Sequence, residues 1–475
     1  MNDFGNDYKK NMTIEFDYNN MMKEFIGEHG ISQLDIQQLD IKNAILFMEE
    51  KRKNGKMDWR DLPYNQDDIC NEIISYVNEV KHKFEAFVVL GIGGSALGPI
   101  AVHQAINHPF YNEISRDKRN GYPKFYVIDN IDPEKLVYLF EIIDIRKTIF
   151  NFITKSGSTV ETMSQFMIIK NMLQKQLGDN YYENLVCTTD KENGALIKIA
   201  KNENYKTFII PSGVGGRFSE FTPVGLLPAA FCGINIKGLL DGAKHMDNIC
   251  KNQDIYKNPA YMYAILNYIS IKNGKNMCVM MPYADSLKYI SDWYAQLWAE
   301  SIGKKYDNYG NILNAGSTPI KAVGATDQHS QLQLYTEGPF DKIIVFIGVE
   351  NYKKSISIPK IYEDIVEISF LGGKTQNELI KIEQKATEFA LFKAKRPNMT
   401  FTLSEVNENS IGQIIYLFEV ATAFMGELLN IDAFNQPGVE EIKNTTYAYL
   451  GKNGYEQKKK ELDEIIKKNN NYIIF

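Results

Sequence analysis

The chain has 475 residues, of which 44% are hydrophobic and 24% charged, and its formal net charge is −6. This length predicts two or three domains of an ordinary soluble protein. The acidic balance argues against a partner that is a nucleic acid or an anionic membrane, so an anionic substrate would need a local site. The five cysteines have no paired spacing, which argues against disulfides or a zinc ribbon and favours a reducing, cytoplasmic location.

The first residues, MNDFGNDYKKNM, contain no apolar stretch typical of a signal peptide. Helical periodicity then runs through residues 1–80, which we expect to form an N-terminal helical segment. The most membrane-like stretch of the chain, residues 223–240, contains two prolines, an asparagine and a lysine. A buried helix is therefore expected there rather than a membrane span.

Short apolar runs alternate with helical stretches from residue 84 onward. The first five are FVVLGIG, KFYVIDN, TIFNFITKSGS, NLVCTTD and TFIIPSG. Strands so widely spaced need crossover connections, so they predict a doubly wound parallel sheet over about 84–235. Helices are expected over 236–272. A second series, KNMCVMMPYADSL, IIVFIGVE and VEISFLG, predicts another α/β module and suggests an internal repeat.

The predicted fold class is therefore α/β, with two tandem doubly wound domains. Their expected bounds are 81–235 and 273–445, with an N-terminal helical segment over 1–80, connecting helices over 236–272 and a charged, helical C-terminal arm over 446–475.

The glycine-rich stretch that follows the first predicted strand matches a dinucleotide-binding pattern, Gly91-x-Gly93-x-x-Ala96. That pattern calls for an acidic residue about 20 positions further on, at the end of the next strand. Glu113 lies in a polar stretch instead, and Asp129 comes too late. A phosphorylated small molecule therefore fits this stretch better than a nicotinamide dinucleotide.

A second loop, TKSGST at 154–159, offers four hydroxyls and one ammonium just before a predicted helix. Hydroxyls, a cation and free helix N–H groups suit a phosphate monoester. The alternative is a capping box, Ser158-x-x-Glu161, which needs no ligand. Both can hold together, because a cap uses only one of the hydroxyls.

Four single residues are candidates for chemistry, and each has an ordinary structural alternative. Arg217 follows two glycines and suits an oxyanion, or a structural ion pair. Glu300 lies beside the apolar stripe of a predicted helix and suits a base, although solvated helix glutamates are commoner. His329 lies in the polar loop TDQHSQL, although a lone histidine is more often structural than catalytic. Lys443 lies near a helix start, where the alternative is an exposed helix lysine. No spacing typical of a metal site occurs, so metal catalysis is disfavoured, and neither a nucleophile elbow nor a Walker lysine is present.

Five stretches in this order resemble the phosphoglucose isomerase family: GIGGSALGP, TKSGSTVET, GVGGRFSEFTPVG, AESIGKK with TDQHSQL, and GELLNIDAFNQPGVEEIK. The resemblance covers about 80–445, and the length is similar to the shorter bacterial form. It implies two sugar-isomerase (SIS) domains and a homodimer with active sites completed by both chains. It also implies a glycolytic and gluconeogenic enzyme that interconverts glucose 6-phosphate and fructose 6-phosphate without a cofactor.

Roles carry over motif by motif as implications of the resemblance. The residues implied to hold the phosphate are Thr154, Lys155, Ser156 and Thr159. Those implied to line the sugar are Gly94, Ser95, Gln296 and Gln436. Glu300 would move a proton from C2 to C1 through a cis-enediol, and Arg217 would stabilise the enediolate. His329 would assist ring opening, helped by Lys443.

Three other functions compete with this interpretation. An isomerase of another phosphosugar would keep the hydroxyl-rich loop but is not expected to carry Glu300, His329 and the GVEEIK stretch together. A non-catalytic phosphosugar sensor would lose the base and usually add a basic DNA-binding segment. An amidotransferase-linked synthase would need an N-terminal cysteine, where this chain begins Met-Asn-Asp-Phe. We therefore favour the isomerase.

Overall fold

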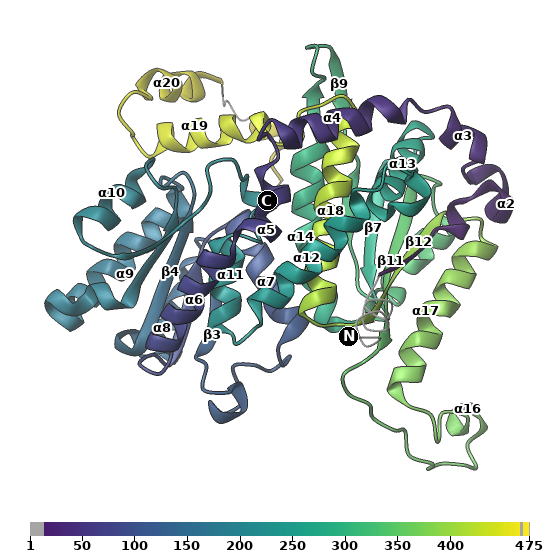
Figure 1. Cartoon of the computed structure of the whole chain (residues 1–475), viewed down its shortest axis with the longest axis horizontal. Coiled ribbons are helices and arrows are strands. Elements are labelled where there is room, and N and C mark those ends of the chain that lie inside the picture. The colour runs from purple at the N-terminus through teal and green to yellow at the C-terminus, as the bar shows by residue number, and fades with distance from the viewer. Residues whose placement is uncertain (1–13, 466–468, 475) are drawn as a thin grey trace, which may run out of the picture.

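A computed structural model of the chain describes residues 14–465 and 469–474. Two sheets lie on opposite sides of a central group of helices that includes α12 (Ile236–Cys250), α14 (Lys288–Ile302) and α18 (Glu408–Leu428) (Figure 1). Runs of aliphatic and aromatic side chains from all three helices pack into one continuous core. The α/β fold class predicted from the sequence is confirmed.

The first sheet contains the five strands predicted from the sequence. They are β2 (Ala86–Leu90), β3 (Lys124–Ile128), β4 (Thr148–Thr154), β5 (Leu185–Thr189) and β6 (Lys206–Ile209). All neighbours are parallel, in the order β3-β2-β4-β5-β6. This is a doubly wound order whose direction of winding reverses between β2 and β4, and ligands bind at the carboxyl ends of strands at such a point.

Helices cover both faces of this sheet, because each crossover between parallel strands returns through a helix. They are α6 (Asp67–Val80), α7 (Leu97–Ile106), α8 (Pro133–Ile142), α9 (Val160–Leu177), α10 (Ala195–Asn202) and α11 (Pro223–Phe231). Every residue of α11 is buried, which confirms the expectation of a buried helix in this apolar stretch. Among the described helices only α18 is long and apolar enough to cross a membrane, and most of it lies inside the protein as a core helix.

The second sheet repeats the topology of the first. Its parallel strands are β7 (Met277–Pro282), β10 (Thr318–Lys321), β11 (Lys342–Asn351) and β12 (Asn398–Glu405). They lie in the order β10-β7-β11-β12, so the first strand again sits between the second and third, which supports the predicted repeat. The remaining helices of this half are α13 (Pro259–Lys272), α15 (Leu332–Glu337) and α17 (Gln376–Lys393).

Smaller elements lie at the ends of the chain and beside α14. They are α2 (Lys23–Ile26), α3 (Gln33–Gln37), α4 (Ile41–Lys53), α5 (Leu62–Asn65), α19 (Glu440–Tyr449), α20 (Glu456–Ile465) and the hairpin of β8 (Lys304–Tyr306) and β9 (Ile312–Ala315). A short strand, β1 (Glu15–Asp17), adds an antiparallel edge to the second sheet. The domain bounds proposed from the sequence stay a prediction.

The prediction that VEISFLG forms a strand is wrong. This stretch forms a short helix, α16 (Val366–Ser369), and a turn, on an arm that leaves the body between β11 and α17 (Figure 1). Its β-branched residues are typical of a strand, but Val366 is 81% exposed and no sheet lies beside it. The last parallel strand is β12, whose partly buried threonines made it less conspicuous in the sequence.

Candidate active site

The hydroxyl-rich loop lies directly after β4, at the carboxyl end of the first sheet. Thr154 Oγ1 and Thr159 Oγ1 are 2.8 Å apart, and Ser156 Oγ lies 3.4 Å from Thr159 Oγ1. Gly157 takes a positive φ of 62° and its Cα approaches Gly194, so the loop folds tightly enough for these hydroxyls to converge. Three hydroxyls therefore gather at the switch point of the sheet.

The predicted capping box does not form. Helix α9 begins at Val160, so Thr159 is its N-cap residue, and no side chain caps the first turn. Glu161 is then one position too early to complete a box with Ser158, whose hydroxyl donates to Ser156 Oγ at 3.4 Å. The N–H groups of the first helical turn remain available beside the hydroxyls, an arrangement that suits an anion.

The glycine-rich loop after β2 brings the two halves of the site together. A Cβ on Gly94 would lie 2.2 Å from the carbonyl oxygen of Gly216, and one on Gly93 would lie 2.7 Å from Gln296 Nε2. The approach at Gly94 is to backbone and leaves no room for a side chain, and Gly93 takes a positive φ of 58° that favours glycine. These glycines thus pack against the loop that carries Arg217 and against α14, and Ser95 follows them at the same edge.

Arg217 is 3% exposed and joins three segments of the chain. Its Nε donates to Ser301 Oγ at 2.6 Å, and its Nη1 donates to Gln436 Oε1 at 2.6 Å and to Glu300 Oε2 at 3.3 Å. Its Nη2 donates to the carbonyl of Ala433 at 2.5 Å. Burial lowers the pKa of Arg217, and the nearby Glu300 carboxylate opposes that shift.

Glu300 lies in the last turn of α14, and its side chain is one-third exposed. Gln296, one turn earlier, donates from Nε2 to Glu300 Oε1 at 3.0 Å. Arg217 holds the other oxygen, so the carboxylate is fixed at both atoms and still open on one side. A fixed, accessible carboxylate can accept a proton from a substrate, and the buried guanidinium beside it can stabilise the anion that results.

Lys155 connects the hydroxyl-rich loop to the loop of Arg217. Its Nζ donates to the carbonyls of Ser212 at 2.5 Å and Val214 at 2.7 Å. Burial lowers the pKa of this ammonium. Lys155 therefore fixes the two loops relative to each other, a role beyond the phosphate contact expected from the sequence.

His329 does not lie beside Glu300 in the same chain. Helix α14 starts at the carboxyl end of β7 and runs back along the sheet, so Trp298 Nε1 reaches Ser317, just before β10, at 2.8 Å. His329 follows the opposite end of β10. The run of α14 from Lys288 to Glu300 spans about 18 Å, which places the two residues at opposite ends of the second sheet.

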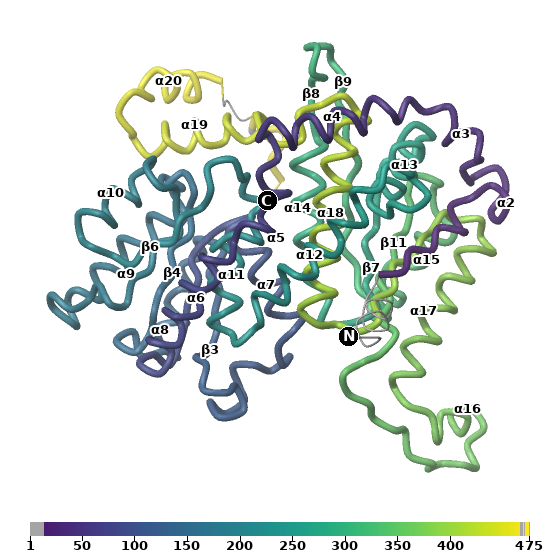
Figure 2. Tube along the Cα trace, in the orientation of Figure 1, coloured from purple at the N-terminus to yellow at the C-terminus, as the bar shows by residue number. Residues whose placement is uncertain are grey.

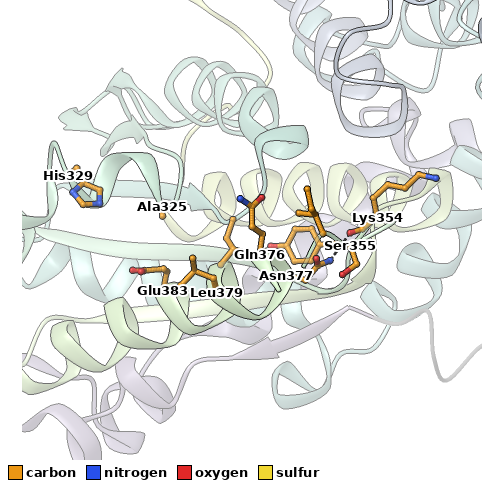
Figure 3. A pocket seen from close by; sticks show the side chains of 11 residues that line it. Ala325, His329, Lys354, Ser355, Gln376, Asn377, Leu379 and Glu383 are labelled. Carbon is orange, nitrogen blue, oxygen red and sulfur yellow. Dashed lines mark hydrogen bonds between the residues drawn. The ribbon is translucent and has the colours of Figure 1, made fainter. Parts of the chain in front are cut away.

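His329 is exposed and lines a cavity of about 480 Å³ together with Tyr352, Lys354, Gln376 and Glu383 (Figure 3). Lys443, on α19, pairs with Glu440 at 2.7 Å on its own helix. In the described part of the chain neither residue makes a hydrogen bond or ion pair with Glu300 or Arg217. The structure thus brings ten of the twelve predicted residues to one side and places His329 at the other end of the second sheet, while Lys443 pairs only with Glu440 among the described residues.

Sequence reasoning missed two residues of this region. Ser301 is fully buried and accepts from Arg217, and Lys304 is 7% exposed beside it. Both stand in the AESIGKK stretch, but nothing in the spacing distinguishes them from ordinary helix-end residues. Among the described residues, no group of three or more His, Cys, Asp or Glu side chains could hold a metal ion.

Two doubly wound sheets with an anion loop at one switch point and a fixed carboxylate–guanidinium pair nearby define an SIS-type α/β protein. The same fold occurs in a glucose-6-phosphate isomerase from Chlamydia trachomatis, with a TM-score of 0.70, 22% identity and coverage of 84% of this chain and 76% of that one. A hypothetical protein from Thermus thermophilus matches with a TM-score of 0.80 and 33% identity, over 92% of this chain and 100% of that one.

The family model of phosphoglucose isomerase matches residues 65–464. A glucose-6-phosphate isomerase from Carboxydothermus hydrogenoformans is 50% identical over 458 residues, covering 96% of this chain and 98% of that relative. One from Methanocaldococcus jannaschii is 40% identical, covering 92% and 99%. The chain belongs to the phosphoglucose isomerase family.

Proposed function

We propose that this chain is an aldose–ketose isomerase that interconverts glucose 6-phosphate and fructose 6-phosphate, with Glu300 as the base. Membership of the family and the names of its relatives support the reaction. The observation that carries the assignment of the base is the Glu300 carboxylate, held by Gln296 and by the buried Arg217 while one side stays open.

The phosphate would bind in the loop after β4. Thr154, Ser156 and Thr159 offer hydroxyls, and the first turn of α9 offers N–H groups. Lys155 adds positive charge to the loop and anchors it to the segment before Arg217. Binding here would fix the far end of the sugar chain, so that its C1 and C2 reach Glu300 beside the loop of Gly94 and Ser95.

The proton transfer needs only two groups. Glu300 would take the proton from C2, which leaves an enediolate, and return it to C1, while the hydroxyl proton moves from O2 to O1 so that the carbonyl ends at C2. Arg217 would stabilise the negative oxygen, a charge present only near the transition state. Gln436 shares Nη1 of Arg217 with Glu300 and would line the sugar at the same point. No redox cofactor takes part, because the proton moves between adjacent carbons of one molecule.

Ring opening would require His329, and its distance from Glu300 within one chain supports a homodimer with shared sites. In that dimer His329 of each chain would serve the site built on Glu300 of the other, and Lys443 would approach the ring oxygen. An arm between β11 and α17 extends away from the body (Figure 2) and exposes Ile361, Tyr362, Val366 and Phe370. An apolar surface of this kind is typical of an interface with another chain.

Five buried free thiols support our proposal that the protein works in the cytoplasm, since a reducing compartment keeps them unpaired. The sensor is the second candidate on the sequence alone, but relatives that cover nearly the whole chain are named as isomerases, which favours the enzyme.

The reaction is tested by a coupled assay of fructose 6-phosphate conversion in the presence of EDTA. We expect robust turnover of fructose 6-phosphate by the unmodified protein. With fructose, which leaves the phosphate loop empty, kcat/KM should be at least about a thousandfold lower. Binding of the phosphosugar without turnover would identify a sensor. Turnover of another phosphosugar alone would identify a different isomerase.

Shared sites are tested with two inactive variants, Glu300→Gln and His329→Ala, carried on differently tagged chains and purified as a heterodimer. One of its two sites would combine an intact Glu300 with an intact His329, so about half of the unmodified activity is expected. Each variant homodimer serves as a control and should be nearly inactive. A heterodimer as inactive as both homodimers would show that the two residues do not meet across chains.

A further inference from the structure

Lys304 is a buried lysine at the end of the helix that carries Glu300. It follows α14 after a single residue, Gly303, and opens β8. Only 7% of the residue is exposed, although lysines are rarely buried unless a partner compensates for the lost hydration. Its next neighbour in sequence, Lys305, is exposed and lies over the ring of Tyr306.

The ammonium of Lys304 bonds to the main chain of the turn that bears the proposed base. Its Nζ donates to the carbonyl of Glu300 at 2.5 Å and to that of Ser301 at 2.9 Å. Carbonyls in the last turn of a helix lack intrahelical partners, and a cation placed there is favoured by the helix dipole. Arg217 holds the same turn through the side chains of Glu300 and Ser301.

The charges around Lys304 come from three elements. Arg217, on the turn Gly216–Phe218, repels it, whereas Asp432, after α18, and Glu300, on α14, attract it. Within the described residues no carboxylate forms an ion pair with Nζ, so the positive charge is not locally cancelled. Burial, followed by repulsion from Arg217, lowers the pKa of Lys304 to about 8.

We propose that Lys304, as an ammonium, is a positioning residue that fixes the last turn of α14 and thereby the Glu300 carboxylate, while adding positive potential where the enediolate forms. This inference rests on the proposed function. Loss of the proton from Lys304 would weaken both hydrogen bonds and remove the charge. Activity would therefore fall as the pH rises through about 8, with the substrate still bound by the loop after β4.

The test compares pH profiles of the unmodified protein, Lys304→Met and Lys304→Arg, with Lys305→Met as the matched control. Lys304→Met is expected to lower kcat about tenfold to a hundredfold, with KM changed less than about threefold and no alkaline decline near pH 8. In Lys304→Arg, whose guanidinium stays protonated, the alkaline decline should move up by at least about one pH unit. Lys305→Met should match the unmodified protein in both respects.

An unmodified protein that turns over but shows no decline near pH 8, or a Lys304→Met variant with unmodified kcat, would overturn the inference. If Lys304→Met does not fold, as judged by circular dichroism, the profile of Lys304→Arg decides, and an unmoved alkaline decline would count against the role of Lys304. An unmodified protein without any isomerase activity would instead contradict the proposed function, so the two failures are distinguishable.

Discussion

Glu300→Gln is expected to lower kcat for fructose 6-phosphate by at least about a hundredfold, because an amide cannot accept the C2 proton. The substitution keeps the shape of the side chain and its contacts with Gln296 and Arg217, so the phosphosugar should still bind. If Glu300 is the proton carrier, the unmodified protein should also exchange solvent deuterium into the sugar during turnover, as seen by NMR, and the variant should lose this exchange together with isomerisation.

The chain offers a matched control for this substitution. Gln333 donates to Glu337 Oε2 at 2.8 Å with the same spacing of four residues, on the short helix α15. Glu337 is exposed and bonds to no arginine, so Glu337→Gln should leave kcat and exchange unchanged. A Glu300→Gln variant that retained more than about a tenth of the activity would require another base.

Much of the first sheet and its loops follows from local sequence, and the reason is physical. The central strands β2, β4 and β5 are buried along their whole length and read as largely apolar runs, and the edge strands β3 and β6 keep enough apolar residues to be recognised. The loop of Thr154 to Thr159 could be predicted because its hydroxyl residues lie within six positions of the sequence. The glycines after β2 were found as well, although their purpose, the close approach of Gly94 to Gly216, is a contact between distant segments.

What the sequence missed depends on such distant contacts. The roles of Ser301 and Lys304 arise only when Arg217 packs against the end of α14. The prediction of a capping box was wrong because α9 starts one residue later than the Ser158-x-x-Glu161 spacing requires. The distance between His329 and Glu300 in the folded chain also cannot be derived from their positions in the sequence. Their separation along the second sheet follows only from the three-dimensional structure.

Asp247 is the centre of a buried ionic network that ties the N-terminal segment to the core. It lies on α12, is fully buried, and accepts from Arg52 on α4 at 2.9 Å, from the fully buried Arg60 at 3.2 Å and from Tyr416 on α18 at 2.6 Å. Burial alone would raise the pKa of Asp247, but the hydrogen bonds from Arg52 and Tyr416 and the charge of Arg60 hold it well below its usual range.

Asp247→Asn is therefore expected to lower the free energy of unfolding by about 3–5 kcal/mol, because it removes the buried carboxylate of the network and leaves Arg60 paired only with the more exposed Glu49. Because the folded pKa of Asp247 is depressed, its contribution is present above about pH 4 and is lost as the pH falls below that value. Urea unfolding at fixed protein concentration should show a constant difference from pH 5 to 8 that narrows in acid.

Asp241, on the same helix, pairs with Lys244 at 3.6 Å, and its side chain is 65% exposed. Asp241→Asn is the matched control and should cost less than about 1 kcal/mol. Equal effects of the two substitutions would show that the buried network contributes no more than a surface pair. That outcome would contradict the view that Asp247 anchors α4 and the turn of Arg60 against the helices behind the active site.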